Sequence, residues 1–116
     1  MVNTGPSPHA PRRVQLSRAK GWRMPPNTVK VDRTTRWGNP FVIGVDGDQA
    51  RCVDLCRHLL EGEVLPAGTL TAARKAYREM VLQEVHALHG LNLACWCKPG
   101  WPCHADVLLK LAERTG

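Results

Sequence analysis

The sequence lacks the patterns that would assign a function class directly. Its apolar runs are too short to cross a bilayer, and residues 1–11 contain no apolar segment of the kind found in signal peptides. It has no Walker loop, no Gly-x-Gly-x-x-Gly sequence, no deaminase signature of His-x-Glu with Pro-Cys-x-x-Cys, and no internal repeat. We therefore expect a cytoplasmic protein. None of the standard nucleotide-binding or zinc-deaminase motifs assigns it to a function class.

An even number of cysteines is also missing, so the five cysteines cannot all pair in disulfides. In a reducing cytoplasm, thiols serve as core residues, metal ligands or reactive groups. The chain has 116 residues, of which 43% are hydrophobic, and this suits one domain with a core of its own. We expect a flexible tail over residues 1–12, which are rich in proline and small polar residues, and a single domain over residues 13–116.

Hydrophobic periodicity predicts an α/β (or α+β) fold, with a small mixed sheet of three to four strands packed by about three helices. The predicted strands are residues 14–17, 28–32, 41–45 and 91–96. The predicted helices are residues 49–61, 71–89 and 102–113. The first two strands are expected to form a hairpin with a long loop. Asp48 is the expected N-cap of the first helix, and Gly62 its stop.

Basic charge is concentrated in the first third of the chain. Residues 1–40 hold eight Lys/Arg and one acid, a net charge of +7, whereas residues 41–116 have a net charge of −1. Trp22 and Trp37 lie in the same basic segment. The segment predicts either a surface that meets phosphate, on a nucleotide or on nucleic acid, or a solvated face that aids solubility.

Residues 91–106, Leu-Asn-Leu-Ala-Cys-Trp-Cys-Lys-Pro-Gly-Trp-Pro-Cys-His-Ala-Asp, form the most informative stretch, which we call the cysteine motif. It is predicted to run from a strand through a tight turn into a helix. Open α/β proteins bind ligands at the carboxyl ends of their strands. The cysteine motif is therefore the expected place for a site.

Three interpretations of the cysteine motif remain open. Cys95, Cys97, Cys103 and His104 offer the ligand types of a zinc site, although they lack the usual Cys-x2-Cys spacing. Alternatively, Cys103 is a thiol activated at a helix N-terminus, with His104 or a distant histidine as its base. In the third interpretation the cysteines are small core residues, and this fits Cys95 and the helical pair Cys52 and Cys56 best.

Residues 33–41, Arg-Thr-Thr-Arg-Trp-Gly-Asn-Pro-Phe, form a second group, which we call the arginine motif. Arg33 and Arg36 could grip a phosphate, Trp37 could stack on a base or sugar, and Asn39 could contact a polar edge. The structural alternative is a tight corner in which Gly and Pro make the turn and the aromatic residues fill the core. That alternative is favoured for Phe41.

The two motifs together resemble the domain-of-unknown-function family numbered 4326, whose members occur in bacteriophages and bacteria. The similar segments are Arg-Trp-Gly-Asn-Pro-Phe, Leu-Ala-Cys-Trp-Cys-Lys-Pro and Pro-Cys-His-Ala-Asp-Val-Leu, and the resemblance spans about residues 14–112. The family commonly has Gly where this chain has Ala105. The resemblance implies a phage or bacterial protein, and it singles out the site positions Asn39, Pro40, Cys95, Cys97, Cys103 and His104.

The predicted function is binding of a nucleotide or another phosphorylated ligand between the two motifs. The expected ligand-binding residues are Arg33, Arg36, Trp37, Asn39 and Cys97. Cys103 and His104 would supply any chemistry, and the sequence leaves open whether the protein is an enzyme. The alternative hypothesis is a non-catalytic module that binds nucleic acid or a host protein. This alternative leaves open whether zinc stabilises the module. Neither hypothesis involves a membrane.

Overall fold

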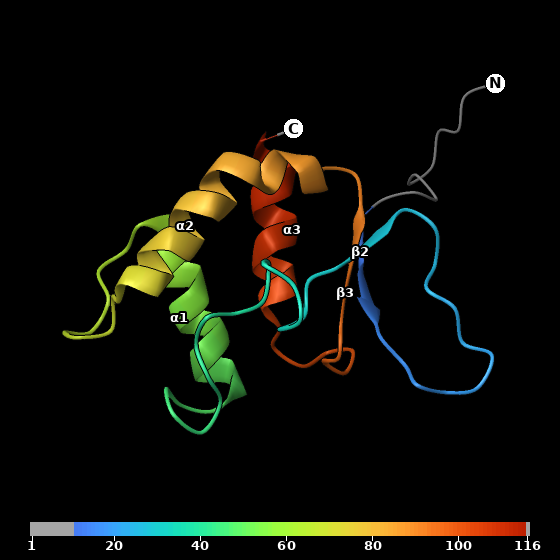
Figure 1. The fold of residues 1–116 in the computed structure, drawn as a ribbon, viewed down its shortest axis with the longest axis horizontal. Coiled ribbons are helices and arrows are strands. Elements are labelled where there is room, and N and C mark those ends of the chain that lie inside the picture. The colour runs from blue at the N-terminus through green and yellow to red at the C-terminus, as the bar shows by residue number, and fades with distance from the viewer. Residues whose placement is uncertain (1–10, 116) are drawn as a thin grey trace.

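The computed structural model describes residues 11–115, which form an α+β fold with all three helices on one side of a small sheet (Figure 1). The elements are β1 (Arg13–Gln15), β2 (Thr28–Lys30), α1 (Gln49–Glu61), α2 (Ala72–Glu84), the 3-10 helix η1 (Val85–Leu88), β3 (Asn92–Cys95) and α3 (His104–Thr115). The predicted tail over residues 1–12 lies outside the described residues, apart from Pro11 and Arg12. The three predicted helices and the small sheet are confirmed.

The sheet has the order β1-β3-β2, and both outer strands run parallel to β3. The predicted mixed sheet and the predicted hairpin between the first two strands are therefore wrong. Hydrophobic alternation locates a strand but does not select its partner. β3 takes the central place because Leu93 and Ala94, on opposite faces, are both fully buried, as expected for the middle strand of a parallel sheet.

The predicted strand over residues 41–45 does not form. Its residues make turns, with one isolated bridge between Ile43 and Gly47. The carboxylate of Asp46 accepts a hydrogen bond from the Val42 N–H at 2.7 Å, and a side chain that bonds nearby backbone in this way competes with a strand ladder. Val42, Ile43 and Val45 are exposed as a result.

The first helix matches its prediction because its end signals are local. The Asp48 carboxylate accepts from the Arg51 N–H at 2.8 Å, and Gly62 ends α1 in a left-handed conformation with φ of 76°. The predicted helix over residues 71–89 is divided into α2 and η1. The last helix begins at His104, two residues later than predicted, and extends to Thr115.

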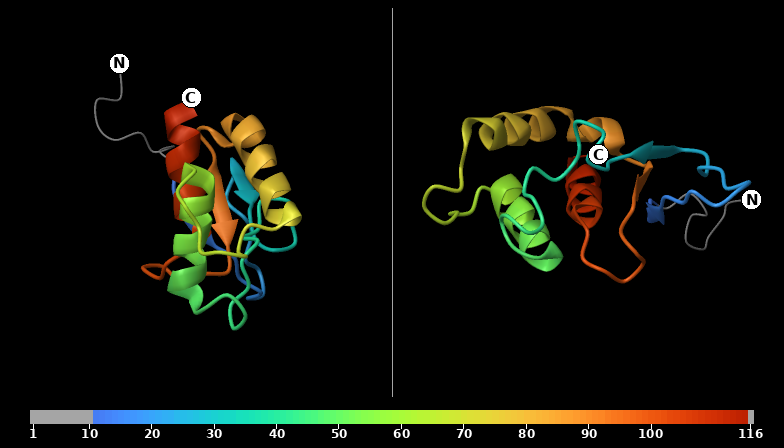
Figure 2. Two further views of the ribbon diagram at one scale, coloured as in Figure 1. Left: turned by 90° about the vertical axis from the view of Figure 1, so that its left-hand side faces the viewer. Right: turned by 60° about the horizontal axis from the view of Figure 1, so that its bottom comes forward.

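The core lies between the sheet and the helices, with α3 between the sheet and the α1–α2 pair (Figure 2). Leu93 and Cys95 point into this core, whereas Ala94 packs with Val14 and Leu16 in a second small cluster. Successive residues of β3 thus face opposite sides of the sheet. β3 runs into the turn before α3, so the carboxyl ends of the strands and the first turns of α1 and α3 face the same lower edge in Figure 1.

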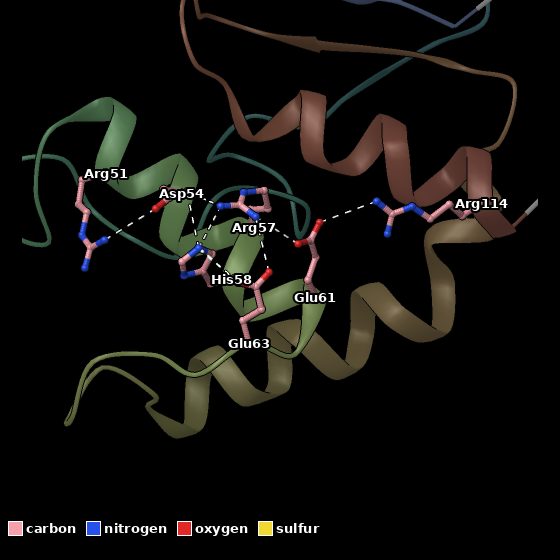
Figure 3. A network of polar contacts seen from close by, with 7 residues as sticks. All are labelled: Arg51, Asp54, Arg57, His58, Glu61, Glu63 and Arg114. Atoms are coloured by element: carbon pink, nitrogen blue, oxygen red, sulfur yellow. Dashed lines mark hydrogen bonds and ion pairs between the residues drawn. The ribbon is translucent and has the colours of Figure 1, made fainter.

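Charged side chains line the exposed side of α1 and reach the end of α3 (Figure 3). Arg57 lies 2.7 Å from the Asp54 carboxylate and 3.2 Å from that of Glu61, and Arg114 of α3 lies 3.8 Å from Glu61. Pairs this exposed to solvent contribute little each to stability. They lie on the solvent face of α1 and take no part in the site described next.

Candidate functional site

A cavity of about 410 Å³ lies at the carboxyl ends of β2 and β3. Its lining includes residues 32–34 after β2, residues 95–97 at the end of β3, and Asn39, Gln49 and His104. The arginine motif and the cysteine motif therefore share one cavity. The position is where parallel sheets bind ligands, and the volume is within the range of small-molecule sites.

Arg33 and Asn39 build the corner of the arginine motif. The Arg33 guanidinium donates to the carbonyl oxygens of Asn39 at 2.7 Å and Phe41 at 2.8 Å. The Asn39 side chain donates to the Cys52 carbonyl at 3.1 Å and accepts from the Phe41 N–H at 2.9 Å. Asn39 thus ties the corner to α1. A guanidinium has five N–H groups, so Arg33 keeps donors for a ligand after these two bonds.

The other two candidate ligand contacts of the arginine motif lie away from the cavity. The Arg36 guanidinium pairs with Glu84 of α2 and lies over the Trp37 ring at 4.9 Å. Trp37 is only 4% exposed, and its carbonyl accepts from the Tyr77 hydroxyl at 2.9 Å. Phe41 is fully buried, in agreement with the packing interpretation. Trp37 and Phe41 fill the core, and Arg36 belongs to the surface beside α2.

Trp96 and Asp32 form a pair in the cavity wall that we did not predict as site residues. The Trp96 indole N–H donates to the Asp32 carboxylate at 3.0 Å, and the Thr34 hydroxyl donates to it at 2.6 Å. Burial alone would raise the pKa of Asp32, but these hydrogen bonds outweigh burial and hold it below the ordinary value. Trp96 is 40% exposed, with the Arg18 guanidinium 4.3 Å from its ring. The sequence contained one signal for a role of Asp32 in the site: it is the lone acid among the basic residues 1–40.

Three sulfurs converge beside the cavity. The Sγ atoms of Cys95, Cys97 and Cys103 lie within 4.8 Å of one another, and those of Cys95 and Cys103 are 2.8 Å apart. Cys95 ends β3, Cys97 follows two residues later, and Cys103 directly precedes α3. The strand and the helix start therefore bring the three thiols together, as the cysteine motif suggested.

Arg13 of β1 holds the turn that carries these cysteines. Its guanidinium donates to the carbonyls of Lys98 at 2.9 Å and Trp101 at 2.8 Å, and pairs with Asp106 of α3 at 2.8 Å. The Arg13 side chain is only 12% exposed. A residue 88 positions away in sequence from Trp101 thus fixes the shape of the turn, and the sequence carries no local signal for it.

Hydrogen bonds among the three thiols shift their pKa values in different directions. The pKa of Cys97 is lowered because the Cys103 and Cys95 thiols donate to its sulfur. The pKa of Cys103 is raised because it donates to both neighbours and is buried. The hydrogen bond that Cys95 accepts from Cys103 would lower its pKa. The hydrogen bond that Cys95 donates to Cys97, together with burial, has the larger effect, so the pKa of Cys95 is raised. Of the three thiols, Cys97 is therefore the one that loses its proton most readily.

The surroundings of His104 favour the neutral imidazole and one of its two tautomers. Its Nε2 lies 2.7 Å from the Val31 carbonyl oxygen, which can only accept, so Nε2 carries the hydrogen. Nδ1 then bears a lone pair, and it lies 4.0 Å from the Cys103 Sγ. Burial lowers the pKa of His104, and the bond to Val31 opposes this only in part. The side chain is 6% exposed, so its contacts are within the protein and the cavity.

Of the two residues that we had assigned to chemistry, only one lines the cavity. His104 lines the cavity, whereas Cys103 is 1% exposed and is not part of the cavity lining. Cys97 is half-buried and lines it, so Cys97 is the more accessible of the clustered thiols. Cys52 and Cys56 are buried on α1, and burial raises the pKa of Cys56 to about 12. Both behave as core residues, although Cys52 also borders the cavity.

These features define a small α+β domain with a cysteine cluster and a cavity at the carboxyl ends of parallel strands. The family model for Domain of unknown function (DUF4326) matches residues 14–114, and the chain belongs to that family, as its two motifs indicated. Neither the curated proteins nor the solved structures provide a significant match. Within residues 11–115, no helix has the length and apolar character needed to span a membrane.

Proposed function

We propose that this protein binds a nucleotide or another phosphorylated small molecule in the cavity between the arginine and cysteine motifs. The observation that carries the proposal is that the two motifs line one cavity at the carboxyl ends of parallel strands. That position is the usual ligand site of open parallel sheets. A volume of about 410 Å³ suits a ligand the size of a mononucleotide.

The cavity walls supply different groups for the different parts of such a ligand. The remaining Arg33 donors meet the phosphate, and the exposed part of Trp96 meets the base. Thr34 and Gln49 supply polar contacts between the two. Trp96 thus takes the stacking role first expected of Trp37, and Arg33 alone takes the role first shared with Arg36.

Titration of AMP, GMP and inorganic phosphate into the purified protein tests the proposal, with heat and tryptophan fluorescence as readouts. We expect saturable binding of at least one nucleotide. Arg33→Lys should weaken it about tenfold, because a single ammonium cannot bond two oxygens in parallel. Trp96→Phe should remove most of the fluorescence change, since Trp96 lines the cavity.

Arg36→Ala is the matched control, because Arg36 pairs with Glu84 outside the cavity. It should leave the affinity within about twofold of the wild-type value, consistent with its surface position. Circular dichroism of Arg33→Lys separates a binding defect from unfolding of the corner. The proposal fails if none of the three probes binds, or if Arg36→Ala weakens binding as much as Arg33→Lys does.

A second candidate function, nucleic-acid binding, is favoured by the long loop between β1 and β2. This loop (residues 16–27) carries exposed Arg18, Lys20, Trp22 and Arg23, and it extends to one side of the fold (Figure 1). Basic groups interleaved with an aromatic side chain suit single-stranded nucleic acid. If short single-stranded DNA binds here, Arg23→Ala should lower the slope of log affinity against log salt by about 0.7. An unchanged slope, or no DNA binding at low salt, would eliminate this candidate.

A further inference from the structure

The cluster of Cys95, Cys97 and Cys103 has the composition of a metal site rather than of a core contact. Three thiols lie within 4.8 Å of one another, and an imidazole nitrogen with a lone pair lies 4.0 Å from one of them. We propose that Cys95, Cys97 and Cys103, together with Nδ1 of His104, bind one zinc ion. The inference does not depend on what occupies the neighbouring cavity.

The sulfur spacing is close to what tetrahedral zinc requires. Zinc–sulfur bonds of about 2.3 Å place two sulfur ligands of one tetrahedral ion about 3.8 Å apart. All three pairs here fall within 4.8 Å, and Cys95 and Cys103, at 2.8 Å, need to separate by about 1 Å. Side-chain rotation about the Cα–Cβ bonds is enough for such a change.

His104 adjoins the three sulfurs on the side of Cys103, although its ring nitrogens lie outside the group whose ligand atoms are all within 4.8 Å of one another. Zinc–nitrogen bonds of about 2.0–2.1 Å place a nitrogen about 3.6 Å from a sulfur on the same tetrahedral ion. Nδ1 of His104 is 4.0 Å from the Cys103 Sγ. Zinc-bound histidines commonly donate their other N–H to a backbone carbonyl, and Nε2 does so here toward Val31 at 2.7 Å. The tautomer with the lone pair on Nδ1 is thus set without the metal.

The donor set favours zinc. Thiolate and imidazole are the ligands of structural zinc sites, and three cysteines with one histidine form a common set. On binding, the remaining S–H bonds break, their protons pass to solvent, and three zinc–sulfur bonds and one zinc–nitrogen bond form without any oxidation or reduction. The product carries a net charge of −1. The Arg13 guanidinium, which pairs with Asp106, holds the turn through Lys98 and Trp101.

Metal content is the first test. Protein expressed with zinc in the medium and purified without chelator should contain close to one zinc per chain by mass spectrometry. Cobalt(II) added to metal-free protein should produce the visible bands of a tetrahedral ion and a thiolate-to-cobalt charge-transfer band. Absence of both zinc and the cobalt bands would overturn the proposal, as would a Cys95–Cys103 disulfide in protein kept under reductant.

Variants identify the ligands. Cys97→Ser should lower zinc affinity by about a hundredfold or more, and it is the variant least damaging to the fold because Cys97 is only half-buried. His104→Ala should retain the charge-transfer band but shift the visible cobalt bands. Cys56→Ala is the matched control, since Cys56 is a buried cysteine outside both the cluster and the cavity lining, and it should keep a full equivalent of zinc.

Thiol labelling keeps the test valid if a variant fails to fold. In the wild-type chain, zinc should slow reaction of Cys97 with a thiol reagent at least tenfold, and a chelator should restore the rate. Equal rates with and without zinc would contradict the site. A His104→Ala spectrum identical to that of the wild type would overturn the assignment of the fourth ligand.

Discussion

Gly38 of the arginine motif provides a sharp test of how tightly the corner is built. A Cβ atom at this position would lie 2.7 Å from the Arg33 Cα and 2.8 Å from the Asp32 carbonyl oxygen. Both neighbours are backbone atoms, so no side-chain rotation relieves the contact. Gly38 is needed because two backbone segments approach each other closely.

The cost of Gly38→Ala follows from this geometry. Ordinary contacts begin near 3.4 Å, so the two backbone segments must separate by about 0.7 Å. Overpacking of this kind costs about 1–3 kcal/mol. The shift also weakens the bonds from Arg33 to the carbonyls of Asn39 and Phe41, at about 1 kcal/mol each when lost. Alanine also lowers the conformational entropy of the unfolded chain, and this offsets about 0.4–1 kcal/mol of the loss in stability. We expect a net loss of about 2 kcal/mol.

Urea denaturation followed by circular dichroism measures this loss. With a slope of about 1.5 kcal/mol per molar urea, the midpoint should fall by about 1.3 M. The melting temperature should fall by about 8 °C for a domain of this size. Gly38→Asn should be at least as damaging, because it adds the same Cβ and more atoms.

Gly21 is the control, because it has a left-handed φ of 82° and no atom within 4 Å of a Cβ built on it. Asparagine tolerates this conformation better than alanine does. Gly21→Asn should therefore cost less than about 0.5 kcal/mol, and Gly21→Ala about 1 kcal/mol. If the free energy of unfolding of Gly38→Ala is within about 0.5 kcal/mol of the wild-type value, the close approach of the backbone at the corner is not the reason that glycine is needed.

Three further predictions concern single contacts. Arg13→Met removes the three bonds that hold the cysteine-bearing turn and should lower the free energy of unfolding by about 2 kcal/mol, whereas a loss below about 0.5 kcal/mol would contradict that role. Tyr77→Phe deprives the Trp37 carbonyl of its hydroxyl donor and should cost about 1–2 kcal/mol in thermal unfolding, and an unchanged melting temperature would argue against the bond. The folded-state pKa of Asp32 lies below 3.8, so its contribution is complete above about pH 5 and is lost as the pH falls through that lower pKa. Asp32→Asn should therefore flatten the fall in stability between about pH 5 and pH 2, and an equally steep fall would refute this.

The elements that were predicted well are those whose signals lie within a few residues. α1 begins where Asp48 caps it and ends where Gly62 adopts a left-handed conformation, and both signals are adjacent to the helix. The core interpretation that the sequence favoured for Cys95 likewise agrees with its place in the main core. The strand expected over residues 41–45 failed because one carboxylate, that of Asp46, bonds the backbone instead.

The sheet pairing could not be obtained in the same way. β1 and β2 are neighbours in the chain, yet β3, more than 60 residues after β2, lies between them. Which strand pairs with which depends on how apolar surface is buried across the whole domain. A hydrophobic pattern within one segment carries no information on that choice.

Periodicity, capping and turn chemistry act over a few residues, so local signals were enough to predict the three helices and the types of residue at the two motifs. The long-range packing of the chain, in contrast, places Arg33 at the cavity while Arg36 pairs with Glu84, 48 residues away. It also brought Trp96 to Asp32, and Arg13 to the turn that carries the cysteines. Those contacts join residues far apart in the chain, and their partners are selected by packing and by the need to satisfy buried polar groups.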